Sequence, residues 1–469
     1  MNEKLQNDLN KLIPNLNASI NAEDLKRHSI DALNPNRVFQ ATKELTTLPL
    51  IIVRPKNTYE VATVVRFASK EGIPIVPWGG GTGVMGAAAS IESGIVLDLK
   101  FLNSIESIDP IAQLTVVGAG IVLKNLNTLL QAHGMFLAHD PWSLPIATIG
   151  GAISTNGVGY LAGKYGSMGE QVLGLEVVLP SGEILQPKLV SKVAGPNLNH
   201  LFIGGEGSFG IITKAAIFTP QNPEHTSLRS IQFPNFECGF HAVQEMQSLG
   251  LNPALVDFAE EFPSETKNRF LHSEITLYLG FFGYHEEVLS QRRRAMQICE
   301  SYGGKNLGQL KAKEFWDHRH DSGERYKKEV IERASPPNRN QTWRMDYLHV
   351  ALPPSKVLEY RRECQRLFEA YNIPVREWSL WARTDLFSFM ISNPSPLDDK
   401  QRTQVAETID QILMLAQDLG GTMEYCHGVG MKHLHLFPRD QGQGIELLQK
   451  WKNSVDPNGI LNPGKLGLR

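Results

Sequence analysis

The stretch VPWGGGTGVMG, residues 76–86, is the part of this sequence whose residue types point most directly to chemistry. Five of its eleven residues are glycine, and so much bare backbone is needed where a partner approaches closely or where φ is positive. Successive backbone N–H groups without side chains form a concave site for an anion, most often a phosphate. The stretch therefore predicts phosphate binding, with a tight glycine turn that holds no ligand as the alternative.

Gly81, Gly83 and Gly86 also satisfy the pattern G-x-G-x-x-G of nicotinamide dinucleotide sites, with Asp98 downstream. That pattern needs a helix directly after the loop, because the helix N-terminus faces the pyrophosphate. Only AAASIES, 87–93, separates the last glycine from the next predicted strand, which is too short for a crossover helix. A P-loop is excluded as well, because no Lys-Ser or Lys-Thr pair follows.

Two further glycine-rich stretches follow, PWSLPIATIGGAISTNGVG at 141–159 and LFIGGEGSFGIITKAAI at 201–217. The first has neither helical nor strand periodicity, and the second runs directly into a predicted strand. Three such loops so close together favour one extended ligand that touches backbone along its length. A dinucleotide such as FAD has that length, whereas a small metabolite does not.

Regular elements must position these loops. Apolar residues at i, i+3, i+4 and i+7 predict a helix over 58–72, which ends at a glycine. Short apolar runs predict strands at 73–76 and 94–99, on either side of the first loop. Residues 165–185 predict a strand, a Ser-Gly turn and a returning strand. The highly charged stretch 311–341 predicts a solvated helix or loop, with a lid as one reading.

Length and composition limit the class of protein. The 469 residues predict two or more domains, and the net charge of −3 gives no sign of a nucleic-acid or anionic-membrane partner. No apolar run reaches the ~20 residues of a membrane span, and the N-terminus lacks a signal-peptide core. The four cysteines are widely spaced, so we interpret them as reduced thiols of a cytoplasmic protein.

Several ordered motifs resemble a known family: PWGGGTG (77–83), ATIGG (147–151), TNGVG (155–159), GLEVVLPSGEIL (174–185), GGEGSFGIIT (204–213) and DPNGILNPGK (456–465). They are similar to the FAD-binding superfamily of p-cresol methylhydroxylase and vanillyl-alcohol oxidase, which includes D-lactate dehydrogenase and alkyl-dihydroxyacetonephosphate synthase. The resemblance implies an α+β protein, with a two-subdomain FAD-binding fold and an inserted α/β cap domain. The implied divisions are an N-terminal helical segment 1–45, an FAD-binding domain 46–220, a cap 221–420 and a C-terminal return 421–469.

The resemblance also implies roles for particular residues. The first loop would hold the pyrophosphate, the second the ribityl chain and flavin, the third the adenosine half, and the C-terminal motif would return to the flavin side. The residues concerned are Pro77, Gly79, Gly80, Gly81, Thr82 and Gly83; Pro141, Ser143, Thr148, Gly151, Asn156 and Gly159; Glu206, Gly210, Ile211 and Ile212; and Asn462 and Lys465.

For catalysis the first candidate is His427, which lies in a His-Gly motif found at the active site of the resembling proteins and has a suitable pKa range. A structural histidine bonded to backbone is the alternative. Arg383 and Arg344 are candidates for holding a carboxylate or phosphate, although either could be an ordinary surface arginine. Tyr347, Tyr425 and Glu377 are weaker candidates, and the nearby aromatic residues are expected to form cap core.

Two departures from the family narrow the function. The metal-dependent branch has histidines and a glutamate where this chain has Leu380, Phe387 and Cys426, so no metal is expected. A site formed by His427, His433 and His435 is an alternative, if the last two lie on one face of a strand. The loops hold neither His nor Cys for a covalent flavin, and His139 lies just outside, so non-covalent FAD is predicted.

The function expected from the resemblance is an FAD-dependent oxidoreductase that oxidises an alcohol, hydroxy acid or phenol. The alternatives are an alkyl-dihydroxyacetonephosphate synthase-like transferase, a flavin-binding protein without catalysis, and an NADPH-using reductase of the enolpyruvyl-sugar type. The substrate is expected to be a small molecule. The electron acceptor, which could be oxygen, a quinone or a redox protein, stays open, as does assembly into a homodimer.

Overall fold

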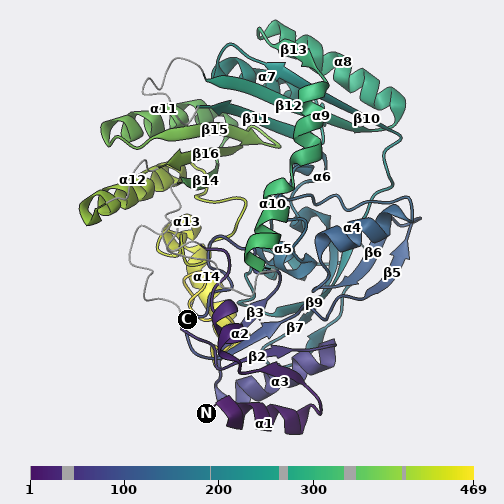
Figure 1. Ribbon diagram of the computed structural model, residues 1–469, viewed down its shortest axis with the longest axis vertical. Helices are drawn as coiled ribbons and strands as arrows, with labels where there is room; N and C mark the ends of the chain where they lie inside the picture. Colours follow the sequence, from purple (N-terminus) through teal and green to yellow (C-terminus); the bar gives the residue numbers. More distant parts are fainter. Residues whose placement is uncertain are drawn as a thin grey trace.

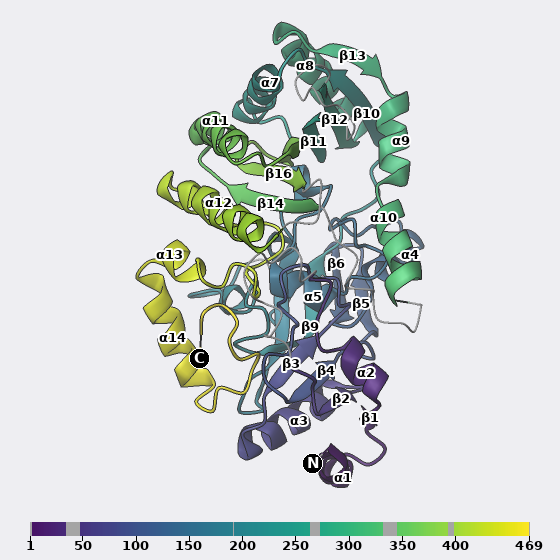
Figure 2. The same cartoon turned by 60° about the vertical axis from the view of Figure 1, so that its left-hand side comes forward.

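The computed structural model describes residues 2–33, 47–190, 192–262, 273–331, 345–392 and 398–468. These residues form three β-sheets surrounded by helices (Figure 1). Two of the sheets lie in the lower half of the molecule, and the third lies at the opposite end, with helices against it (Figures 1 and 2).

The first sheet carries the first glycine loop at one strand end. Its strand order is β1-β2-β4-β3, formed by β1 (Asn17–Ser19), β2 (Ile51–Arg54), β4 (Ile95–Asp98) and β3 (Ile75–Trp78). Helices α1 (Asn2–Leu12), α2 (Ala22–Arg27) and α3 (Thr58–Glu71) accompany it. The predicted helix is confirmed as α3, which is capped by Asn57 and ends at Gly72 with φ 64°. Residues between the loop and β4 form no helix, as expected.

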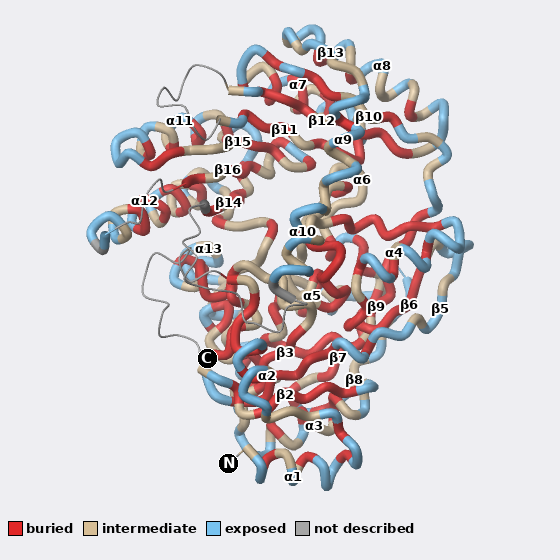
Figure 3. The backbone as a smooth tube through the Cα atoms, in the orientation of Figure 1, coloured by how far each residue is buried: buried red, intermediate tan, exposed pale blue. Residues whose placement is uncertain are grey.

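The second sheet is antiparallel, with the order β5-β6-β9-β7-β8. Its strands are β5 (Ile105–Asp109), β6 (Leu114–Gly118), β7 (Val172–Val178), β8 (Ile184–Leu185) and β9 (Ile211–Phe218). The short helices near it are α4 (Leu123–Gln131), α5 (Ile149–Thr155), α6 (Ala162–Tyr165), η3 (Gly169–Gln171) and η4 (Leu198–Leu201). The predicted strand, turn and returning strand are confirmed as β7 and β8. Figure 3 shows that β7 and β9 are largely buried.

Helix α5 is a difference from the sequence analysis, which expected no regular structure over 141–159. Glycine, serine and threonine form helices poorly by themselves, so the sequence carries no helical signal. In the fold, the Thr148 side chain accepts the N–H of Gly151 and caps the helix at its N-terminus. At Gly150 a Cβ would lie 2.8 Å from the Ala119 side chain, so close packing against the neighbouring loop requires glycine there.

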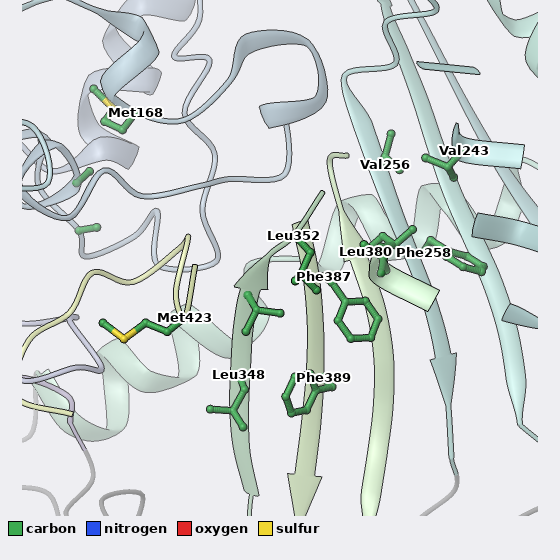
Figure 4. Packing of buried hydrophobic residues seen from close by; sticks show 14 of the residues in the cluster. Met168, Val243, Val256, Phe258, Leu348, Leu352, Leu380, Phe387, Phe389 and Met423 are labelled. Atoms are coloured by element: carbon green, nitrogen blue, oxygen red, sulfur yellow. The ribbon is translucent and has the colours of Figure 1, made fainter. Parts of the chain in front are cut away.

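The third sheet has seven antiparallel strands in the order β13-β10-β12-β11-β15-β16-β14, and we call it the cap sheet. Its strands are β10 (His225–Gln232), β11 (Leu255–Glu261), β12 (Glu274–Gly283), β13 (Lys305–Gly308), β14 (Met345–Ala351), β15 (Val375–Trp381) and β16 (Leu386–Ser392). Helices α7 (Phe236–Ser248), α8 (His285–Ser301), α11 (Pro354–Ala370) and α12 (Asp399–Asp418) pack with it. One face is apolar and holds Phe258, Leu380, Phe387 and Phe389 (Figure 4).

A chain of helices leads from the cap sheet down to the lower half of the molecule (Figures 1 and 2). It consists of α9 (Leu310–His318), α10 (Asp321–Tyr326) and the π-helical turn η5 (Lys327–Ile331), so the described part of the charged stretch is helical. Asp140, which directly precedes the second glycine-rich stretch, binds the two residues between α9 and α10, at 2.7 Å from Arg319 Nε and 2.9 Å from His320 Nε2. The remainder of 311–341 lies outside the described residues.

The C-terminal part contains α13 (Phe437–Gln441) and α14 (Gly444–Val455) and then returns to the first sheet. Ile75 donates its N–H to Ile460 O at 2.7 Å and accepts the N–H of Asn462 at 2.8 Å. The final segment thus extends the edge of β3 beside the first glycine loop. None of the helices in the described ranges is long and apolar enough to cross a membrane.

Candidate functional site

A cavity lies where the three glycine-rich segments, the cap sheet and the C-terminal part meet. Its walls are formed by residues within 77–84, 139–160 and 206–212, by 256–257 and 381–382 of the cap, and by 426–427. Segments far apart in sequence therefore contribute to one site. Most of the predicted cofactor residues line this cavity: Pro77, Gly79, Gly80, Gly81, Thr82, Gly83, Pro141, Ser143, Thr148, Gly151, Gly159, Glu206, Gly210, Ile211 and Ile212.

The first glycine loop presents unused hydrogen-bond donors to the cavity. Among the described residues, none accepts a hydrogen bond from the backbone N–H groups of residues 79–83. Five successive free donors beside a cavity fit the oxygens of a pyrophosphate, whose negative charge they would partly neutralise. This donor set is the observation by which the site fits FAD.

The glycines of this loop are also required by protein packing. A Cβ at Gly80 would lie 2.4 Å from Ile146 O, and one at Gly81 would lie 2.6 Å from the Trp78 ring. Gly81 has φ +66°, which a side chain would strain further. The first loop can therefore lie against the second only because it lacks side chains.

Two buried carboxylates fix the loop that carries His427. Glu424 accepts the N–H groups of Tyr425, Cys426 and His427 at 3.0, 2.7 and 3.0 Å. Glu206 of the third glycine loop accepts those of Val429 and Gly430 at 2.7 and 2.9 Å. Burial outweighs these donors and raises the pKa of each carboxyl to about 7. Glu206 thus lines the cavity, but its carboxylate accepts hydrogen bonds from the protein backbone.

His427 itself lines the cavity and contacts a second histidine. Its ring centroid lies 4.6 Å from that of His349 on β14, at an interplanar angle of 76°. His349 Nδ1 lies 2.7 Å from Ser388 Oγ, which lies 2.7 Å from Tyr425 Oη. An imidazole at the cavity wall thus packs against a histidine that belongs to a hydrogen-bonded group with Ser388 and Tyr425.

Several predicted residues lie elsewhere. Arg383 lies in the turn after β15, with a side chain that is 53% exposed, and binds the Asp385 carboxylate through Nε and Nη2 at 2.9 and 2.6 Å. The apolar run around it alternates between the two faces of a sheet, but the arginine falls in the connecting turn. Arg344 lies outside the described residues.

Three predicted cofactor residues are absent from the cavity wall and support it from behind. Asn156 ends α5 in the left-handed conformation, and its side chain accepts the N–H of Gly169 at 2.9 Å. Asn462 donates to Ala87 O and Glu206 O at 2.8 and 2.6 Å, and Lys465 donates to Ala89 O at 2.8 Å. These side chains therefore bind the protein backbone rather than the cavity.

Of the three positions compared with the metal branch, Leu380 and Phe387 do not line the cavity, whereas Cys426 does. Leu380 and Phe387 are completely buried on the apolar face of the cap sheet (Figure 4), and burial raises the pKa of the Cys426 thiol. The strand on which the alternative three-histidine site depended does not form, because His433 and His435 both lie in turns. His435 binds Asp410 at 2.9 Å. Within the described ranges, no three His, Cys, Asp or Glu side chains lie close enough together to hold a metal ion.

The sequence analysis missed some residues of the cavity wall. Asp257 of β11, Trp381 of β15 and Tyr160 line it, as does His139, whose pKa burial lowers to about 4. Tyr347 Oη donates to Glu377 and lies 3.1 Å from Ser379 Oγ, so these weaker candidates bind one another on the cap sheet. Asp257 belongs to no motif, and the residues of β11, LVDFAEE, show no regular alternation of polar and apolar positions that would mark its face.

Comparisons with known proteins show the family of this chain. Residues 49–187 match the family model of the FAD binding domain, and residues 222–466 match that of the C-terminal domain of FAD linked oxidases. A D-lactate dehydrogenase from Archaeoglobus fulgidus is 31% identical over 434 residues, which cover 89% of this chain and 91% of that protein. The glycolate oxidase subunit GlcD of Bacillus subtilis is 27% identical, covering 91% of each chain.

Solved structures confirm the fold. p-Cresol methylhydroxylase superposes with a TM-score of 0.78 at 18% identity, covering 99% of this chain and 96% of the other. An alkyldihydroxyacetonephosphate synthase superposes with a TM-score of 0.75 at 20% identity, covering 98% and 84%. The predicted fold class and FAD cofactor are therefore confirmed, and the chain belongs to the FAD-linked oxidase family as an FAD-dependent oxidoreductase.

Proposed function

We propose that this enzyme removes a hydride from a C–H carbon of a small alcohol, hydroxy acid or phenol, with FAD bound non-covalently and without a metal ion. When bound, FAD supplies the acceptor for the hydride that leaves this carbon. The first glycine loop would hold the pyrophosphate through the free N–H groups of residues 79–83. The relatives named for D-lactate and glycolate support a hydroxyl substrate as the class.

In this proposal His427 takes the proton of the substrate hydroxyl. The observation that carries it is the placement of His427 on the cavity wall, on a loop that Glu424 and Glu206 hold at both ends. A fixed imidazole can accept a proton near neutral pH without reorganising its surroundings. The ring of His349 packs against that of His427 and helps to fix its position.

The experiment is anaerobic bleaching of the flavin by a panel of alcohols, hydroxy acids and phenols, followed by admission of air. We expect at least one class to bleach the flavin, and fast recolouring would identify oxygen as an acceptor. A spectral change only with an acylated glycerone phosphate, without bleaching by any alcohol, would instead identify the transferase. That outcome would overturn the proposed reaction.

The non-covalent and metal-free parts are tested separately. Acid precipitation is expected to leave a colourless pellet, and colour that stays in the pellet would show a covalent flavin, with His139 the first position to check. Metal chelators are expected to leave activity unchanged. Inhibition that zinc or manganese reverses would show that a metal takes part.

A further inference from the structure

The cavity contains an acidic group that has no partner among the residues that the structure describes. Three carboxyl side chains line it, from Asp31, Glu206 and Asp257. Asp31 accepts the N–H of Leu33 at 3.0 Å, and Glu206 accepts two N–H groups of the C-terminal loop. Asp257 forms neither a hydrogen bond nor an ion pair with any described residue. A polar group in such a place is stabilised when a ligand supplies the missing donor.

The surroundings of Asp257 are acidic. Tyr347 is hydrogen-bonded to Glu377 near it on the cap sheet, and burial together with the charges of Glu377 and Glu261 raises the pKa of Asp257 to about 8. Among the described residues, no lysine or arginine lines the cavity. The charge of Arg319 acts on the neighbouring Tyr160, but its guanidinium already forms an ion pair with the Asp140 carboxylate at 2.7 Å.

This distribution of charge disfavours a carboxylate at the cap end of the cavity. A carboxylate buried there would find no lysine or arginine among the described lining residues to compensate its charge, and a buried charge without a partner is costly. A hydroxyl or a protonated amine would instead donate to Asp257. The described part of the cavity is therefore complementary to a donor group.

We propose that Asp257 selects the substrate by accepting a hydrogen bond from a hydroxyl or protonated amine on its non-reacting part, so that polyols or amino alcohols are preferred to 2-hydroxycarboxylates. The inference rests on the proposed alcohol oxidation and names its substrate class. His427 serves the reacting hydroxyl, and Asp257 serves the other end of the same molecule. Asp257 is in this sense a specificity-determining residue.

The test uses three probes with the same secondary alcohol and different end groups: lactate, 1,2-propanediol and 1-amino-2-propanol, each as both enantiomers. Anaerobic flavin bleaching by the holoenzyme is measured at pH 7. We expect the diol or the amino alcohol to exceed lactate by about tenfold or more, since a charge-assisted or buried hydrogen bond contributes on that scale. Lactate as the best of the three would overturn the proposal.

Two variants distinguish the donor groups. Asp257→Asn keeps an acceptor but removes the charge. The rate of flavin bleaching by the amino alcohol should therefore fall by about 10- to 100-fold, while the rate with the diol should stay unchanged. Asp257→Leu should lower the rate of flavin bleaching with both the diol and the amino alcohol. The control is Glu286→Gln on α8, which removes an exposed carboxylate that does not line the cavity and should change rates only slightly. An unchanged order of the probes in both Asp257 variants, or an equal effect of the control, would overturn the proposal.

Binding separates this inference from the proposed function. If no alcohol bleaches the flavin, the reaction is wrong, but perturbation of the flavin absorbance still reports whether each probe binds. Binding of the amino alcohol at pH 7 should also release a proton, because the carboxyl ionises when an ammonium pairs with it. Binding of lactate alone, or of none of the three probes, would contradict the role of Asp257.

Discussion

At the scale of single residues, His427 differs from the other histidines of the C-terminal part in its surroundings. It lines the cavity and contacts His349, whereas His433 is buried and His435 is bound to Asp410 at the surface. The motif alone could not separate a base from a structural histidine. The contacts of the neighbouring backbone with Glu424 make it a positioned group, which favours the catalytic role.

Replacing His427 by asparagine should leave the fold and bound FAD intact and slow flavin reduction. General bases contribute on the order of 100- to 10,000-fold, so stopped-flow bleaching should fall within that range. The pH profile of reduction should lose its limb near neutrality, because the ionising group has been removed. His435→Asn is the control, since its half-exposed ring binds Asp410 away from the cavity. A wild-type rate and profile in His427→Asn would contradict its role as the base, and Tyr425 and Tyr347 would be the next residues to replace.

At the scale of elements, the first glycine loop owes its composition to two requirements. It lines the cavity with N–H groups from which no described residue accepts a hydrogen bond, and its Cα atoms lie against the second glycine-rich segment. The sequence predicted the first requirement from phosphate chemistry. It could not predict the second, because the contact joins residues about 65 positions apart in the chain.

Gly81→Val should abolish retention of FAD. The new Cβ would lie 2.6 Å from the Trp78 ring at a residue with φ +66°, so the loop must move and its donors lose their arrangement. Flavin absorbance relative to protein absorbance after purification measures this. Gly134→Val is the control, with φ +70° and no atom within 4 Å of a Cβ, so it shares the backbone strain without the collision. Full yellow colour in Gly81→Val would contradict the assignment.

At the scale of the whole molecule, the chain leaves the lower half of the structure, forms the cap sheet and returns. We propose that residues 46–220 and 421–469 form one FAD-binding domain into which the cap, 221–420, is inserted. The support is the backbone pairing of Ile75 with the segment around Leu461, and the contacts of Asn462 and Lys465 behind the first loop. In this proposal the last residues of the chain, although far away in sequence, support the cofactor site.

Deletion of 456–469 should therefore cost FAD binding rather than only loosen a chain end. The deletion removes the partner of the β3 edge and the donors that hold residues 87–89. A milder variant, Lys465→Met, should weaken FAD binding in an equilibrium titration, because Ala89 O loses its buried donor. Lys450→Met on the exposed side of α14 is the control. Normal FAD affinity in the truncated chain would argue against this arrangement.

The sequence by itself determined the parts of this protein that depend on local backbone: the glycine loops, the helix before them, the strands around them and, by resemblance, the FAD fold. Only the tertiary structure decided which side chains meet. Strand alternation places Leu380 in the core and Trp381 at the cavity, and that assignment depends on the pairing of Phe258 with Leu380, two residues 122 positions apart in the printed sequence. The same pairing brings Asp257 to the cavity, while the turn after β15 carries Arg383 away from it. A shift of one residue in that register would exchange the two faces, and no local signal specifies it.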